Sequence, residues 1–267
     1  MQVFPIDPVI FNLGFLQVRW YGLMYVIGFV LAGFLCRPLV DQGFLQIEKK
    51  RIDTLVSYVI VGTFIGARLA YVLIYNWDYY SLHLEEIFFV WQGGLSFHGA
   101  IVGIFFGIYF FSKKMRIPFF QALDTAALIG CQGLFWGRVG NFINGELYGR
   151  VTEVPWGIVF PGGGPYARHP SQLYEAVMEG IVLSIILWLV KRKVRIHGII
   201  TSIFFTGYGL FRYLVEFFRE PDKQMGFYFV GTTTMGQILC ILMIAFGIGF
   251  AVFVCKKNIP IPKEKGV

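Results

Sequence analysis

Long apolar stretches separated by short polar connections dominate the pattern of this 267-residue chain. Each stretch holds about 20 residues, the length needed to cross ~30 Å of hydrocarbon as an α-helix. In lipid, a helix also satisfies its backbone hydrogen bonds within the segment. The pattern therefore predicts an all-α integral membrane protein, a bundle of seven transmembrane helices interrupted by Gly-rich segments. The expected spans cover residues 18–36, 54–75, 96–111, 119–137, 171–190, 198–218 and 234–255.

The composition favours the same class. Only 15% of the residues are charged, whereas ordinary soluble domains carry about 25%. The cysteines show no CxxC or Cys/His spacing, so neither a metal site nor a disulfide framework is indicated. We therefore expect a membrane protein without a cofactor.

The charged residues predict the orientation of the bundle. Lys and Arg gather after the first, third, fifth and seventh spans, whereas the connection 76–86 has neither. Because positively charged connections stay in the cytoplasm, we expect these loops and the C-terminus inside and the N-terminus outside. The net charge of +7 then acts as a topology signal and gives no reason to expect nucleic-acid binding.

A polar region rich in Gly and Pro, residues 141–170, separates the fourth and fifth spans. It is too long for a simple turn and too short for a separate domain. We expect a small head on the outer face, of the kind that forms a lid or a binding loop. Residues 1–267 otherwise form a single membrane domain in this interpretation.

Five polar side chains fall at similar depth in this orientation. At ~1.5 Å per residue, Arg68 lies ~22 Å up the second span and Arg212 ~21 Å up the sixth. Arg138 lies at the outer end of the fourth span, and Tyr21 and His98 lie just inside the outer starts of the first and third. One Arg near a helix end can snorkel to the headgroups. Three on separate spans, each costing ~2.5 to 3.5 kcal/mol on insertion scales, indicate a shared anion.

Local signals predict how two of the spans begin. The Gly pair at 93–94 should break the chain, with Ser96 as N-cap of the third span. His98 is then either a structural histidine or a base beside an anion held at the helix start. Ser171 should cap the fifth span, with Glu175 in its first turn.

The sixth span carries a polar face of its own. Tyr208, Arg212 and Glu216 follow at i, i+4 spacing. Arg212 and Glu216 form either a structural ion pair or part of a binding site. Asp124, at the inner end of the fourth span, is expected to be structural, and Arg168 is either structural or a substrate contact.

The stretch 136–150 reads W-G-R-V-G-N-F-I-N-G-E-L-Y-G-R. Gly137 and Gly140 should allow close helix approach around Arg138. Beyond them, a tight turn would bring backbone close to a ligand. A turn that only closed the bundle would not need so many polar side chains. The candidate ligand contacts of the turn are Asn141, Asn144, Glu146 and Gly149.

Seven sequence segments resemble those of the bacterial prolipoprotein diacylglyceryl transferase family. They follow in order over essentially the whole chain, which makes the resemblance specific. The segments are D-P-V-I-F near the start, W-Y-G-L-M-Y at 20–25, G-A-R-L-A-Y-V-L at 66–73, G-G-L-S-F-H-G at 93–99, G-R-V-G-N-F-I-N-G-E-L-Y-G-R at 137–150, R-H-P-S-Q-L-Y-E at 168–175 and G-Y-G-L-F-R-Y-L-V-E-F-F-R-E-P-D at 207–222.

The resemblance implies a seven-span enzyme of the bacterial inner membrane, with a periplasmic N-terminus and head. Such enzymes move the diacylglyceryl group of phosphatidylglycerol onto the lipobox cysteine thiol of a prolipoprotein, forming a thioether and releasing glycerol 1-phosphate. The implied partners are phosphatidylglycerol, the prolipoprotein signal peptide and membrane lipids. The segment 160–167 is shorter than in some relatives, which leaves its contacts open. The family's essential positions correspond to Tyr21, His98, Arg138, Asn141, Glu146, Gly149 and Arg212.

This chemistry suggests roles for the polar residues in the periplasmic half. Arg138 and Arg212, as bidentate donors, would neutralise charge on the departing glycerol phosphate. Arg68 is a weaker third candidate for this contact. The other reactant is a thiol of reference pKa ~8.5, which needs a base or a positive field. We expect His98 to assist its deprotonation and Tyr21 or Glu146 to orient groups by hydrogen bonds.

Three other functions compete with this interpretation. An anion or lipid transporter would continue its polar residues to the cytoplasmic side, but the inner halves are nearly all apolar. A non-catalytic lipid-binding scaffold would not require His98. A phospholipase would need an activated nucleophile, and the chain has no G-x-S-x-G motif.

Overall fold

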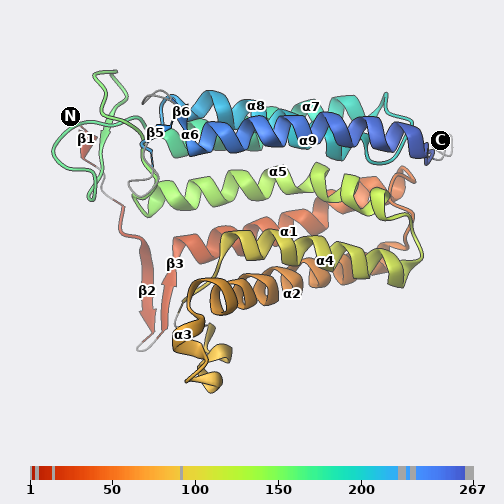
Figure 1. Ribbon diagram of the computed structural model, residues 1–267, viewed down its shortest axis with the longest axis horizontal. Helices are drawn as coiled ribbons and strands as arrows, with labels where there is room; N and C mark the ends of the chain where they lie inside the picture. Colours follow the sequence, from red (N-terminus) through yellow and green to blue (C-terminus); the bar gives the residue numbers. More distant parts are fainter. Residues whose placement is uncertain are drawn as a thin grey trace. The chain divides into compact units, whose positions relative to one another are not determined.

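The computed structural model describes residues 2–3, 6–13, 16–90, 93–221, 227–228 and 233–261. In these residues, seven long helical segments follow in the predicted order (Figure 1). The segments are α1 (Trp20–Asp41), α2 (Ile52–Ala70), α4 (Phe97–Met115), α5 (Phe119–Ile143), α6 with α7 (Ser171–Glu175 and Leu183–Lys191), α8 (Ile199–Glu216) and α9 (Met235–Lys257).

Two of these segments contain a wider helical turn. A π-helical segment, η2 (Tyr71–Tyr75), continues α2, which a 3-10 turn, η1 (Lys49–Arg51), precedes. A second π-helical segment, η5 (Ala176–Val182), joins α6 to α7. Among the described residues, four segments are each long and apolar enough to cross a membrane: Trp20–Asp41, Lys49–Tyr75, Ser171–Lys191 and Met235–Lys257. The chain is therefore a multi-pass membrane protein, and the predicted all-helical fold is confirmed.

The helix starts show which local predictions hold. Ser96 caps α4 as predicted, because its hydroxyl accepts a hydrogen bond from the Gly99 amide at 3.2 Å. Gly93 and Gly94 have positive φ values of 91° and 74°, which accounts for the break before this helix. The predicted Ser171 cap is wrong. Ser171 is already the first helical residue of α6, and its hydroxyl donates to the Leu147 carbonyl at 3.1 Å.

Short elements fill several of the connections between the helices. They are α3 (Trp77–Tyr80), the 3-10 turn η3 (Leu84–Phe88) and three two-stranded pairs. The pairs are β1 (Gln2–Val3) parallel with β4 (Ile158–Val159), β2 (Val9–Leu13) antiparallel with β3 (Leu16–Arg19), and β5 (Phe227–Tyr228) antiparallel with β6 (Thr233–Thr234).

The polar head follows α5, which continues to Ile143 instead of ending at residue 137 as predicted. Arg138 and Asn141 therefore lie on the helix and not at its end. Backbone hydrogen bonds fasten the head: the Gly149 amide donates to the His169 carbonyl, and the Arg150 amide to the Phe218 carbonyl, each at 2.9 Å. The head is thus tied to the end of α8.

The chain divides into two compact units, although its sequence suggests a single domain. The first unit contains the described residues of Met1–Ala32 and Ala127–Pro262, and the second those of Gly33–Ala126. Helices α1 and α5 each continue from one unit into the other.

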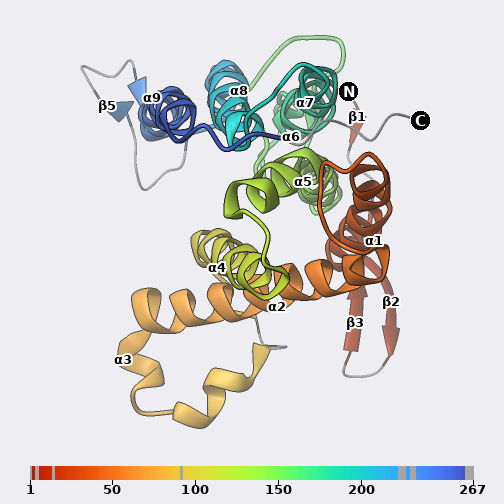
Figure 2. The ribbon, with the colours of Figure 1, turned by 90° about the vertical axis from the view of Figure 1, so that its right-hand side faces the viewer.

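Glycines bring helix backbones together within each unit. In the first unit, α8 and α9 lie side by side (Figures 1 and 2), and a Cβ on Gly209 would stand 3.0 Å from the Cys240 carbonyl oxygen. In the second, α2 and α4 pack so closely that a Cβ on Gly66 would stand 2.3 Å from the Gly99 carbonyl oxygen. Close approach through small residues is how membrane helices associate when lipid is as apolar as their side chains.

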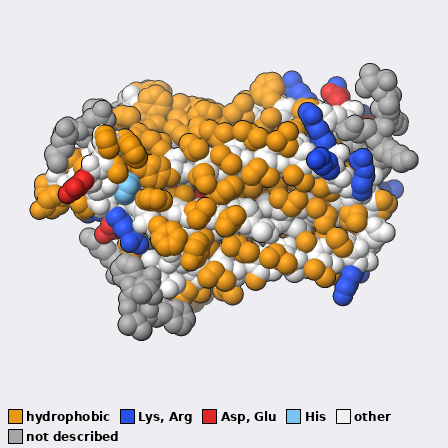
Figure 3. Space-filling model, turned by 90° about the horizontal axis from the view of Figure 1, so that it is seen from above, with side chains coloured by type: hydrophobic (Ala, Val, Ile, Leu, Met, Phe, Trp, Pro, Cys, Tyr) orange, Lys and Arg blue, Asp and Glu red, His pale blue; other side chains and the backbone are white. Residues whose placement is uncertain are grey.

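The surface agrees with a place in the membrane. On the face seen in Figure 3, hydrophobic side chains cover the middle of the helices, and Lys and Arg gather toward the end at which α9 finishes. The last turns of α7 and α9 carry Lys191, Lys256 and Lys257. Cationic side chains there are also near helix C-termini, where the helix dipole favours them.

Candidate active site

Arg138 projects from α5 onto two carboxylates of the fifth helical segment. Its Nε lies 2.6 Å from Glu175 Oε2, and its Nη2 lies 3.7 Å from Glu179 Oε2. It also donates a hydrogen bond to the Tyr208 hydroxyl of α8. Three helical segments of the first unit therefore meet at this one guanidinium.

Two further arginines share the same carboxylates. Arg212 Nη1 lies 2.6 Å from Glu216 Oε2 and 3.6 Å from Glu175 Oε1. Arg219 Nη1 lies 3.3 Å from Glu175 Oε1. The Arg212–Glu216 pair that the i, i+4 spacing allowed is present, but it belongs to a network. We call Arg138, Arg212, Arg219, Glu175, Glu179 and Glu216 the arginine–glutamate cluster.

The π-helical turn lies where this cluster is built. Glu175 ends α6, and Glu179 lies inside η5, yet both carboxylates reach Arg138. Such wide turns occur mostly as single insertions in α-helices, frequently at functional sites. Both glutamates therefore reach Arg138 from the part of the helix that contains the wider turn.

Burial distinguishes the two kinds of residue in the cluster. The Glu175 and Glu179 side chains are 1% and 0% exposed, whereas those of Arg138 and Arg212 are 16% and 14% exposed. The carboxylates lie behind, and the guanidinium groups keep an accessible edge. Three arginines balance three glutamates, which offsets the cost of burying these charges. The guanidinium donors therefore face the accessible side of the cluster, where a ligand can contact them.

The Asn-rich turn after α5 forms a second polar group in the first unit. The side-chain amides of Asn141 and Asn144 both donate to Glu146 Oε1, at 2.8 and 3.2 Å. Gly145 and Leu147 take positive φ values of 65° and 57°, so the backbone turns sharply around Glu146. Among the described residues, no cation lies within ion-pair distance of Glu146. Its carboxylate is therefore oriented by amides, which argues against a counter-ion role.

Gly149 has a packing role. A Cβ there would stand 2.4 Å from the Phe218 carbonyl oxygen and 2.8 Å from that of His169. Nearby, Arg168 donates to the carbonyls of Gly149 and Gly163 and pairs with Glu220 at 3.1 Å. These contacts favour the structural alternative for Arg168. They hold the turn that carries Glu146 and leave Gly149 no room for a side chain.

Tyr21 begins α1 beside α5. A Cβ on Gly140 would stand 2.8 Å from the Tyr21 ring, so Gly140 does allow the close approach that we predicted. Gly137 does not, because nothing lies within 4 Å of its position. The Tyr21 and Tyr25 hydroxyls hydrogen-bond at 3.0 Å, and Tyr25 lies within electrostatic reach of Arg138 and Glu146.

Arg68, in the second unit, is held in a different way. Its guanidinium donates four hydrogen bonds to backbone carbonyls, those of Glu86, Ile87, Gly93 and Gly94, at 2.6 to 3.1 Å. The residue is 5% exposed, and it lies over the Tyr80 ring. Its donors fasten the connection between η2 and α4. The expected third phosphate contact is therefore better explained as a structural arginine.

His98 lies in the first turn of α4, also in the second unit. Its Nδ1 is 3.4 Å from the Tyr75 hydroxyl at the end of η2. The side chain is exposed, as a base that receives a proton from a substrate needs to be. This hydrogen bond orients the ring.

The structure brings together some of the predicted residues and adds others. Arg138, Tyr208, Arg212 and Glu216 belong to one cluster of the first unit, and Asn141, Asn144 and Glu146 form a group after it. The sequence analysis did not identify Glu179 or Tyr25 and assigned Glu175 only to a helix start. Two glutamates four residues apart in an apolar span carry the same insertion cost that singled out the arginines. That signal was available for Glu175 and Glu179.

Comparison with known proteins gives a consistent result. The family profile for "Prolipoprotein diacylglyceryl transferase" matches residues 8–253. A phosphatidylglycerol–prolipoprotein diacylglyceryl transferase of Geobacter sulfurreducens is 47% identical over 259 residues, covering 97% of this chain and 99% of that protein. The enzyme of the same name from Pseudomonas paraeruginosa is 44% identical over 264 residues, covering 98% and 99%. With the buried arginine–glutamate cluster in a multi-pass membrane fold, these matches show that the chain belongs to the prolipoprotein diacylglyceryl transferase family.

Proposed function

We propose that this chain transfers the diacylglyceryl group of phosphatidylglycerol to the lipobox cysteine thiol of a prolipoprotein, with the arginine–glutamate cluster binding the phosphate. In this reaction the thiol sulfur forms a bond to a glycerol carbon, and the bond from that carbon to the phosphate oxygen breaks. The bonding electrons leave with the phosphate, and glycerol 1-phosphate departs. Family membership supports the reaction, and the cluster supports the site.

The phosphate contact in this proposal falls to Arg138 and Arg212. A phosphodiester carries one negative charge, and the departing phosphate monoester gains more. Donors already in place, in surroundings that exclude water, stabilise such charge strongly, and guanidinium groups bind phosphate oxygens in pairs. The exposed edges of the two guanidiniums suit this role. The buried carboxylates behind them restrict their rotamers.

We assign His98 as the base that accepts the proton of the attacking thiol. A neutral imidazole accepts a proton from a thiol, and the thiolate that results is the nucleophile. The Tyr75 hydroxyl at 3.4 Å from Nδ1 orients the ring. The proposal requires His98 and Arg138 to reach the same lipid, since sulfur attacks the carbon that phosphate leaves.

The remaining polar residues orient groups in this scheme. Asn141 and Asn144 hold the Glu146 carboxylate, and Tyr21 holds the Tyr25 hydroxyl. Both groups lie on the first unit, beside Arg138 or on the turn that follows it. We assign them to the positioning of the glycerol headgroup and of the incoming peptide, and we assign Gly149 to the packing of that turn.

The orientation in the membrane rests on the charged connections. Lys and Arg follow α1, α4, α7 and α9, whereas the connection after η2 is acidic. The positive-inside rule then puts the N-terminus and the head in the periplasm and the C-terminus in the cytoplasm of a bacterial inner membrane. The site lies in the periplasmic half, where a translocated signal peptide presents its cysteine.

The decisive experiment measures both products of the proposed reaction. The purified protein, reconstituted with phosphatidylglycerol vesicles and a lipobox peptide, should yield a peptide heavier by one diacylglyceryl group, together with free glycerol 1-phosphate. A peptide with Ala in place of the lipobox cysteine is the control and should stay unmodified. A transporter or a lipid-binding scaffold gives no peptide adduct, and a phospholipase releases lipid products without one. Absence of the thioether would overturn the proposed function.

The His98 assignment has its own test. His98→Gln keeps hydrogen-bonding capacity but cannot take up a proton near neutral pH. We expect kcat to fall by about 100-fold or more, as for loss of a general base. The remaining rate should increase with pH, because more of the thiol is then ionised without assistance. A wild-type rate at every pH would show that another group takes the proton.

A further inference from the structure

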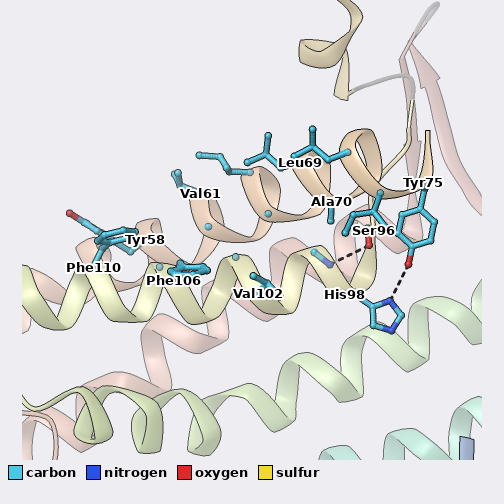
Figure 4. Close-up of a pocket in the computed structure, with 18 of the residues that line it drawn as sticks. Tyr58, Val61, Leu69, Ala70, Tyr75, Ser96, His98, Val102, Phe106 and Phe110 are labelled. Carbon is cyan, nitrogen blue, oxygen red and sulfur yellow. Dashed lines mark hydrogen bonds between the residues drawn. The ribbon is translucent and has the colours of Figure 1, made fainter. Parts of the chain in front are cut away.

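A long apolar cavity lies between two helices of the second unit, outside the arginine–glutamate cluster. Its volume is about 850 Å³, and α2, η2 and α4 line it from Ser57 to Tyr75 and from Ser96 to Phe110. Figure 4 shows its side chains along the two helices, with Val61 and Leu69 on one wall and Val102 and Phe106 on the other. We call it the α2–α4 groove.

Glycines shape this groove. Gly62 and Gly66 of α2 face Gly99 and Gly103 of α4, and the backbones approach so closely that a Cβ on Gly103 would overlap the Gly62 carbonyl. The walls are large apolar residues that no other part of the second unit covers, since Val61 and Val102 are each 54% exposed. The groove is therefore narrow, apolar and open to the hydrocarbon.

The two ends of the groove offer different polar groups to a ligand. One end has the Tyr58 hydroxyl, and the other end has a hydroxyl and an imidazole together. The Tyr75 hydroxyl and the His98 imidazole meet there, one turn from the Ser96 cap (Figure 4). At the opposite end the Ser57 hydroxyl donates to the Asp53 carbonyl of its own helix at 2.7 Å. A ligand with a long apolar part fits the groove, and a polar group at its end would meet Tyr75 and His98.

The groove is too small to enclose a peptide helix. The 18 residues from Ser57 to Tyr75 span ~27 Å at ~1.5 Å per residue, and a helix of that length and ~10 Å diameter occupies roughly 2,000 Å³. This is more than twice the cavity volume of about 850 Å³. A single hydrocarbon chain is thin enough to lie inside.

We propose that the α2–α4 groove binds one acyl chain of the diacylglyceryl substrate, with its ester end at Tyr75 and His98. The inference rests on the proposed function, because the ester end must lie near the base that activates the thiol. One leaflet is about half of the ~30 Å hydrocarbon core. A chain that enters at His98 therefore reaches ~15 Å, or about ten residues, along α4. Val102 lies within that reach. Val61, ~21 Å along α2 from Tyr75, lies beyond it.

These two valines provide a matched pair of variants. They line the same groove and have equal exposure. Val102→Trp fills the half that the chain occupies, and Val61→Trp fills the other half. With dipalmitoyl phosphatidylglycerol, Val102→Trp should raise KM by about tenfold, equivalent to losing roughly two buried methylene groups. Val61→Trp should change KM by less than about twofold. The kcat of both variants should stay near wild type.

Substrates with different acyl-chain lengths test whether the occupant of the α2–α4 groove is the substrate. Dihexanoyl phosphatidylglycerol passes less chain beyond Val102, so its KM should increase less in Val102→Trp than that of the dipalmitoyl lipid. If bulk lipid fills the groove, both variants keep wild-type KM for both substrates, which overturns the proposal. If the signal peptide occupies it, KM for the peptide increases instead, which also overturns it.

A photoreactive phosphatidylglycerol with a diazirine near the middle of one acyl chain gives a readout besides turnover. Its adducts on wild-type protein should include residues of α2 or α4 near Leu69 and Val102, and Val102→Trp should lose them while Val61→Trp keeps them. Adducts confined to other helices would contradict the proposal. Should Val102→Trp fail to fold, Leu69→Trp on the facing wall makes the same test. Failure of the proposed function is distinguishable, because wild-type protein then forms no thioether with any lipid.

Discussion

Arg68 and Arg138 look alike in sequence, since each is a charged residue in a predicted span at similar depth, yet their surroundings differ. Arg68 in the second unit donates four hydrogen bonds to backbone carbonyls and is 5% exposed. Arg138 in the first unit contacts the carboxylates of Glu175 and Glu179 and keeps an exposed edge. The comparison shows that depth alone does not distinguish an arginine that holds backbone from one that keeps an exposed edge. The acceptors around each guanidinium make this distinction.

The two environments have different consequences for a bound anion. Carbonyl groups occupy the Arg68 donors, so that a phosphate would have to displace a folded connection to reach them. Carboxylates balance the charge of Arg138 and fix it from behind, which leaves the accessible edge for a ligand. A structural arginine and a functional one should therefore respond differently to substitution, and the following variants test this.

Arg138→Ala should have the largest effect on turnover. Loss of a preorganised cationic donor to the leaving group lowers the rate by about 100- to 1,000-fold. The measurement is thioether formation by purified protein, alongside the thermal midpoint to confirm that the variant is folded. Glu179 loses its ion-pair partner and Glu175 loses one of three, and breaking a buried pair by itself costs about 3 to 5 kcal/mol of stability. Arg138→Ala/Glu179→Gln should recover much of that stability but none of the activity. A recovery of turnover would show that Arg138 acts only as a counter-ion.

Glu175→Gln should have an intermediate effect. The carboxylate contacts Arg138, Arg212 and Arg219, so its loss frees three guanidiniums from one orientation. We expect kcat to fall by about 10- to 100-fold, because misplaced donors weaken transition-state stabilisation, and Glu175→Asp to restore part of it. The matched control is Glu220→Gln, which removes the half-exposed partner of Arg168 in the head. An exposed pair contributes about 0 to 1 kcal/mol, so its rate should change little. Equal effects of the two Gln variants would contradict a special role for Glu175.

Arg68→Gln should have the smallest effect on turnover and a clear effect on stability. It removes up to four hydrogen bonds and leaves buried carbonyls without donors, at a cost of about 3 kcal/mol. We expect a lower thermal midpoint and a rate, per folded molecule, within a few-fold of wild type. A rate as low as that of Arg138→Ala in a protein of normal stability would restore Arg68 as a phosphate contact.

Several features followed from local sequence alone. The start of α4 at Ser96 and the i, i+4 pair of Arg212 and Glu216 required only the residues within one or two turns. The end of α5 was predicted too early, because Arg138, Asn141 and Asn144 are polar and resemble a loop. In the structure their side chains find partners from other segments and from the turn that follows, so the helix continues to Ile143. These polar residues belong to the candidate site, and they do not mark the end of the helix.

The sequence by itself determined the order and approximate limits of the seven long helical segments. Apolar stretches between polar connections mark such segments one by one, and four of the described segments are long and apolar enough to cross hydrocarbon on their own. The sequence also determined the family, through motifs that extend along the chain. Only the tertiary structure decided which partners each arginine has. The partners of Arg138 come from a segment more than thirty residues away, and those of Arg68 are backbone carbonyls that every residue carries. Neither kind of partner is visible in a pattern of side chains, because both depend on which segments pack together.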